Sequence, residues 1–166
     1  MDIYSNNNQS GEENKNEDSK KNESNNIADS KLSEIESKLQ SQRDEWGQKI
    51  VDLIKQINNV NSLSDAQVHM LSYRQIIVEQ LTKFRIRLKK TQTTYEKKFK
   101  ASFIGYYNYD YKISDKHKTD MVNADLHFYR RQMGLLESQI EFFKESILTL
   151  DKMGYAIKNR VNFEEI

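Results

Sequence analysis

Apolar side chains recur along the last third of the chain in an unbroken alternation of four- and three-residue steps, from Val122 to Val161. Such a heptad pattern is typical of a helix that buries one stripe along its whole length. A helix over residues 120–161 would extend about 60 Å, more than we expect one chain of this size to cover. The stripe, here called the seam, therefore predicts a homo-oligomer. The seam residues expected to contact other subunits are Tyr129, Met133, Leu136, Ile140, Phe143, Ile147, Leu150 and Ile157.

Two other segments predict long helices, and the chain contains no proline, the residue that most strongly disrupts a helix. Apolar residues at helical spacing extend from Leu32 to Ile57. A second helix is expected to begin at Ser64, which forms a capping-box pattern with Gln67. Ser114 is the expected N-cap of the helix that bears the seam. The predicted fold class is all-α, a long helical hairpin with a coiled-coil-like C-terminal helix.

The strongest functional signal lies in residues 83–100, here called the basic segment. Its eight basic residues face one acid, Glu96, which gives a net charge of +7. Aromatic residues lie within and after it, including Tyr106 and Tyr107. Cations neutralise phosphates and aromatic rings stack on unpaired bases of any sequence, so this combination predicts binding of single-stranded nucleic acid. The expected contacts are Lys83, Arg85, Arg87, Lys89, Lys90, Lys97, Lys98, Lys100, Tyr106 and Tyr107.

Three other interpretations of the same residues remain open. Most charge runs are simply solvated helix faces, although those usually alternate in sign. A basic amphipathic helix with Phe99 and Phe103 also fits an anionic membrane surface. The tyrosines could instead pack the bend between two helices.

Gly154 in the seam has two possible roles. It either ends the last helix or permits the close approach of a neighbouring helix.

The ends of the chain differ in composition. Seven acidic and three basic residues give residues 1–30 a net charge of −4, and large apolar residues are scarce there. We therefore expect residues 1–29 to be a disordered acidic tail and residues 30–166 to form a helical DNA-binding and oligomerisation domain. No apolar run approaches the ~20 residues of a membrane span, no secretory signal is recognisable and cysteine is absent, so we expect a cytoplasmic protein.

Signals for catalysis are missing from the sequence. The three histidines are scattered, the five glycines are isolated from one another, and no nucleophile stands in a recognisable pattern with a base. Zinc sites, phosphate-cradling loops and covalent catalysis each require such a pattern. We expect a protein that is not an enzyme and that holds neither a metal nor another cofactor.

Two short motifs resemble a known family. Phe99-Lys100-Ala101 followed by Tyr106-Tyr107, and Gly154-Tyr155-Ala156-Ile157-Lys158 followed by Phe163-Glu164, are similar to motifs of the UvsY-type recombination mediator proteins of tailed bacteriophages. The resemblance covers about residues 64–166, and Ser102 stands where the family has a second basic residue.

This resemblance implies an all-helical homo-oligomer, a ring that is a hexamer or heptamer, which binds single-stranded DNA in the host cell cytoplasm. It further implies that the protein helps a RecA-like recombinase load onto DNA covered by a single-strand-binding protein, without consuming nucleotide itself. The alternative function is a helical coiled-coil scaffold or virion structural protein without a DNA role, whose basic face contacts acidic protein.

Overall fold

The computed structural model describes residues 10–107 and 114–164, with side chains for 26–59, 61–106 and 114–160. The elements in chain order are α1 (Ser10–Ile57), the short 3-10 helix η1 (Val60–Ser62), α2 (Leu63–Tyr107), α3 (Asp115–Asp125) and α4 (His127–Glu164). No strand occurs in these ranges, which confirms the all-α class. Within the described residues, no helix combines the length and the apolar character that crossing a bilayer requires.

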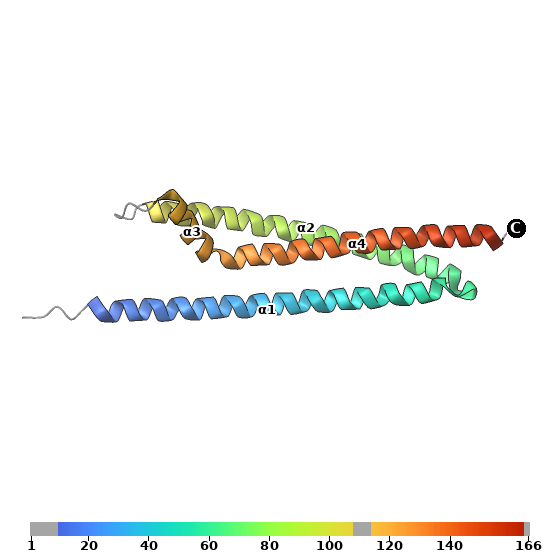
Figure 1. Ribbon diagram of the computed structural model, residues 1–166, viewed down its shortest axis with the longest axis horizontal. Coiled ribbons are helices and arrows are strands. Elements are labelled where there is room, and N and C mark those ends of the chain that lie inside the picture. Colours follow the sequence, from blue (N-terminus) through green and yellow to red (C-terminus); the bar gives the residue numbers. More distant parts are fainter. Residues whose placement is uncertain (1–9, 108–113, 165–166) are drawn as a thin grey trace, which may run out of the picture.

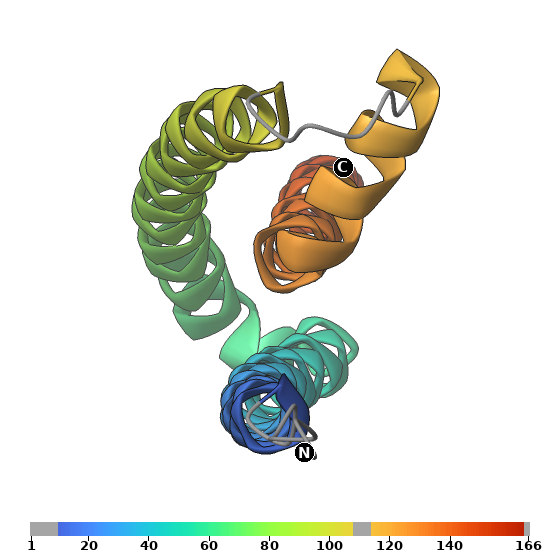
Figure 2. The same cartoon turned by 90° about the vertical axis from the view of Figure 1, so that its left-hand side faces the viewer.

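The three long helices form an up-down-up bundle (Figure 1). α2 reverses direction after the η1 turn, and α4 returns along α2. The turn is fixed by the Ser62 hydroxyl, which donates to the carbonyls of Gln56 and Asn59 at 2.9 and 3.1 Å. Nearby, Arg160 of α4 donates to the Ile57 carbonyl at 2.7 Å and so caps the C-terminal end of α1. Figure 2 shows that α1 and α2 diverge with distance from this turn.

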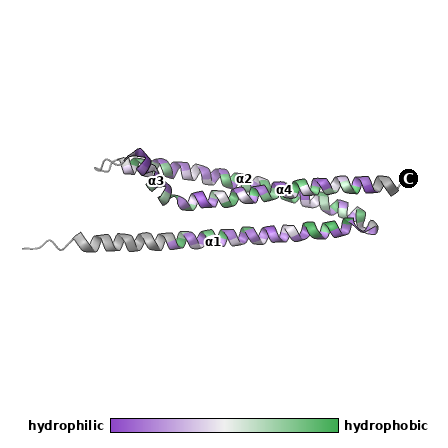
Figure 3. Ribbon diagram, viewed as in Figure 1, coloured by the Kyte–Doolittle hydropathy of each residue, from purple (hydrophilic) through white to green (hydrophobic). Residues whose placement is uncertain are grey.

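One apolar core runs along the bundle and takes residues from all three long helices. Figure 3 shows hydrophobic and hydrophilic residues mixed along each helix, as expected where a helix buries one stripe and leaves the rest in water. Phe84 of α2 meets Phe143 of α4 with ring centroids 5.6 Å apart. The largest fully buried members of this core are Phe143, Leu53, Ile77 and Leu150.

The seam is covered within the single chain, which corrects the expectation that other subunits are needed to cover it. Five of the eight seam residues are buried in the intrachain core, namely Leu136, Ile140, Phe143, Leu150 and Ile157. Ile147 packs against the same core, and Tyr129 and Met133 are half-buried. The physical reason is that α1 and α2 are each as long as the seam, so two helices of the same chain line it. The five buried side chains are not available to another subunit while the bundle is closed.

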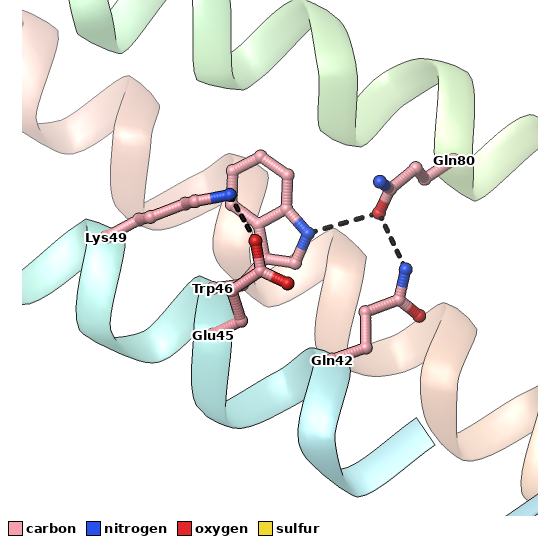
Figure 4. A network of polar contacts seen from close by, with 5 residues as sticks. All are labelled: Gln42, Glu45, Trp46, Lys49 and Gln80. Atoms are coloured by element: carbon pink, nitrogen blue, oxygen red, sulfur yellow. Dashed lines mark hydrogen bonds and ion pairs between the residues drawn. The ribbon is translucent and has the colours of Figure 1, made fainter. Parts of the chain in front are cut away.

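A layer of polar side chains crosses this core and joins all three helices. Gln80 Oε1 of α2 accepts hydrogen bonds from Trp46 Nε1 at 3.1 Å and from Gln42 Nε2 at 3.2 Å, both on α1 (Figure 4). Gln139 of α4, which is fully buried, donates to Gln42 Oε1 at 3.3 Å and accepts from Arg43 Nε at 2.8 Å. Because each of these bonds is lost if one helix slides along another, the layer fixes the register of the bundle.

Helix boundaries differ from the sequence expectation at three places. The seam helix is interrupted at Leu126, whose φ of −103° and ψ of 15° end α3 before α4 begins. α1 already begins at Ser10, whereas the apolar spacing in the sequence predicts this helix only from about Leu32. α2 starts at Leu63, one residue before the predicted cap at Ser64, and Ser62 makes the turn's hydroxyl bonds instead. Ser114 is confirmed as the N-cap of α3.

Gly154 lies inside α4, and the helix continues through it to Glu164. A Cβ atom at this position would lie 3.2 Å from Cε and 3.4 Å from Sδ of Met70 on α2. The close-approach interpretation is therefore the correct one of the two that the sequence leaves open.

Candidate nucleic-acid interface

The basic segment occupies the part of α2 that has diverged from α1 (Figure 2). All eight of its basic side chains are exposed. From Lys83 to Lys100 the helix axis advances about 26 Å. A strand stacked as in B-form DNA, with a phosphate every ~3.4 Å, would place about seven phosphates along that length.

The basic side chains form stripes on either side of the face that α2 buries. Lys83, Arg87 and Lys90 are spaced by four and three residues and share one face, whereas Arg85 and Lys89 share another. Phe84 lies between the two stripes and is buried against α4. The core contact thus turns both stripes toward solvent.

The charge of the basic segment is not compensated by the rest of the described chain. None of its eight cations forms an ion pair with a residue that the structure describes. By contrast, Lys38, Lys49 and Lys55 on α1 each pair with an acid three or four residues away. Hydrogen bonds from Lys38 and Lys55 lower the pKa of Glu34 and Asp52 respectively, as is typical of a solubilising face. The basic segment lacks this pattern and so differs from an ordinary solvated face.

An open groove of about 600 Å³ lies between α1 and α2 at the beginning of the basic segment. Lys83 and Arg87 enter it from α2, and Lys38 enters it from α1. The Arg87 guanidinium lies over the Phe84 ring, 5.7 Å from its centroid, which holds the arginine beside the groove. Lys38 is the residue that sequence reasoning missed, because its proximity to Arg87 depends on how two helices pack and leaves no local signal.

The aromatic residues near the basic segment are largely engaged within the chain. The Tyr106 hydroxyl donates to Asp125 Oδ2 at 2.6 Å, and the Tyr95 hydroxyl donates to Asn123 Oδ1 at 2.9 Å. Packing of the bend is therefore a role that Tyr106 does fill. Tyr107 is the last residue of α2, and its side chain lies outside the described residues, as do Tyr109 and Tyr111 in the following connection.

The membrane-surface interpretation requires a continuous exposed apolar face beside the cations. Phe99 and Phe103, the residues expected to enter a lipid headgroup layer, are half-buried instead. Exposed large apolar side chains in this part of α2 are Ile86 and Ile104, which are 18 residues apart and 51% and 62% exposed. Two such isolated side chains do not make a lipid-binding face.

No group of three or more potential metal ligands occurs among the described residues. The predicted site residues that the structure brings together are the eight cations of the basic segment, with Tyr106 beyond their C-terminal end. A comparison with protein-family models, curated proteins and solved structures found no match. The site itself is therefore the basis for a functional proposal.

Proposed function

We propose that the protein binds single-stranded DNA through the basic segment and acts as a recombination mediator. The observation that carries the binding proposal is a set of eight exposed cations on α2 without an ion-pair partner among the described residues. A phosphate backbone would supply the missing countercharge and release its own condensed ions, which is the dominant favourable term in such binding. The exposed cations of Lys83 and Arg87 and the groove beside them provide the beginning of a path along α2.

The mediator role comes from the resemblance of the two sequence motifs to UvsY-type proteins. In that role the chain binds single strands covered by a single-strand-binding protein and helps a RecA-like recombinase to take their place. A hexameric or heptameric ring is part of the same proposal. Since most seam residues are buried within one chain, subunit contacts in such a ring would use side chains left exposed, such as Leu148 and Tyr155 of α4.

The binding proposal predicts that the affinity for single-stranded DNA falls steeply as the salt concentration rises. One stripe of cations should contribute to this dependence. Replacing Lys83, Arg87 and Lys90 with Ala should flatten the slope of log K against log salt by about 2, since each single-strand phosphate contact contributes about 0.7. The measurement is fluorescence anisotropy of a labelled thymidine oligonucleotide over a range of salt concentration. The matched control replaces Lys49, Lys55 and Lys144, which changes the net charge equally but removes lysines that are already paired and lie outside the groove.

Equal flattening by both triple variants would mean that only net charge matters, and equal affinity for duplex would contradict single-strand recognition. If wild-type binding is absent or independent of salt, the DNA proposal fails and the coiled-coil scaffold or virion component becomes the better description.

The mediator proposal predicts that wild-type protein shortens the delay before recombinase ATPase activity begins on single strands coated with single-strand-binding protein. The variant of Lys83, Arg87 and Lys90 should not shorten this delay, whereas the paired-lysine control should. ATP should be consumed by the recombinase alone. A wild-type protein that binds DNA normally but leaves the delay unchanged with its cognate recombinase would refute the mediator role while leaving DNA binding intact.

A further inference from the structure

Three aromatic rings form a continuous row on α2 beside the exposed lysines of the basic segment. Tyr95, Phe99 and Phe103 are spaced four residues apart, and successive ring centroids are separated by 5.9 and 6.0 Å. The planes of Phe99 and Phe103 are only 14° from parallel. All three side chains are half-buried, whereas the neighbouring lysines at 97, 98 and 100 are exposed. Aromatic side chains beside cations are the groups on which proteins stack unpaired bases.

The helix that packs on this part of α2 is α3. Side-chain hydrogen bonds from Tyr95 to Asn123 and from Tyr106 to Asp125 join the two helices. Tyr95 and Tyr106 are 11 residues apart, or about 16 Å along the axis, so the two bonds bracket Phe99 and Phe103. The C-terminal end of α3, where Val122 is fully buried, is therefore joined to α2 at both ends of the row of rings.

α3 is held less firmly than the long helices. Its buried residues are Lys118 and Val122, and neither belongs to the main core. Leu126, where α3 ends, is buried but is likewise outside that core, and its backbone is not helical. Few buried apolar contacts and an interrupted helix are the features of a segment that opens locally without global unfolding.

The space between α2 and α3 is open next to Tyr106. A cavity of about 290 Å³ lies between the two helices and is lined by Ser102, Gly105, Tyr106 and Asp125. No atom would lie within 4 Å of a Cβ added at Gly105, so this side of α2 has free space. The volume is near the lower limit of small-ligand sites, ~300 Å³.

We propose that Tyr95, Phe99 and Phe103 are a stacking site for unpaired nucleobases, which α3 covers in the free protein and leaves when a single strand binds. The proposal rests on the proposed DNA binding and adds where the bases go: phosphates lie along the lysines, and bases replace α3 on the rings. Bases bind only the open state, so a strand shifts the equilibrium toward it. Any change that weakens the closed state raises the apparent affinity for a strand with bases.

The test compares a thymidine oligonucleotide with an abasic oligonucleotide of the same length, which has the phosphates but no bases. Replacing both Asn123 and Asp125 with Ala removes the two hydrogen-bond acceptors on α3 and should raise affinity for the thymidine strand by about 3- to 10-fold relative to the abasic strand. Asp120→Ala is the matched control, because it also removes one exposed carboxylate of α3 but neither of these two bonds to α2.

A second variant removes the rings. Phe99→Leu combined with Phe103→Leu leaves Tyr95 as the one ring of the row, so it should remove most of the preference for the thymidine strand over the abasic strand and leave abasic binding unchanged. Circular dichroism and the emission of Trp46, which is 3% exposed in the main core, report whether the bundle remains folded. If the ring variant does not fold, the acceptor variant and quenching of a 2-aminopurine base in the oligonucleotide still decide the question.

The inference is overturned if wild-type and acceptor variant bind both strands equally, or if the acceptor variant gains no more than Asp120→Ala. It is also overturned if the folded ring variant retains the wild-type preference for bases. Salt-independent or absent binding of both strands would instead refute the proposed DNA binding and this inference with it.

Discussion

Gly154 illustrates how one missing side chain sets the distance between two helices. A Cβ there would lie 3.2 Å from the Met70 Cε atom, closer than most Cβ contacts, but the thioether is the flexible end of its side chain. At Gly134, in the same helix, an added Cβ would have nothing within 4 Å. Substitution of Gly134 therefore tests helix propensity alone, whereas substitution of Gly154 tests helix propensity together with crowding by Met70.

At this scale we predict that Gly134→Ala raises the free energy of unfolding by about 1 kcal/mol, because alanine has the higher helix propensity. Gly154→Ala should raise it by clearly less, since Met70 has to move, and in a Met70→Ala background the two glycine substitutions should become equivalent. Urea unfolding followed by circular dichroism measures each value. Equal gains from both substitutions in the wild-type background would show that α2 does not restrict the space at Gly154.

At the scale of elements, periodicity predicted the long helices and the Ser114 cap because both depend on neighbours in sequence. The break at Leu126 was missed because a bend of one residue leaves the heptad phase intact, so Val122 and Leu126 are both buried as the seam predicts. The Lys38 contribution to the α1–α2 groove depends on helix packing, and so do the hydrogen bonds from Tyr95 and Tyr106 to α3. The cations of the site could therefore be predicted, but the exposure of its rings could not.

For the whole molecule, the main difference from the sequence expectation is what covers the seam. A heptad pattern records that a stripe is buried but not whether the covering helices belong to the same chain. Here α1 and α2 cover it, and the Gln42, Gln80 and Gln139 layer fixes how the three helices align. Stability of the fold should then be a property of one chain, and any ring would assemble from folded subunits.

This view predicts that Ile140→Asp unfolds the chain instead of merely separating subunits. Ile140 is 7% exposed in the intrachain core, so an unpaired carboxylate there should cost about 3 kcal/mol or more. Leu148→Asp is the matched control on the same helix, because Leu148 is 52% exposed and its replacement should leave helicity intact. Circular dichroism and light scattering on both variants provide the measurement, and the wild-type chain should stay folded at dilutions at which light scattering detects only single chains. An Ile140→Asp chain that stays fully helical but becomes smaller in solution would show that the seam joins subunits after all.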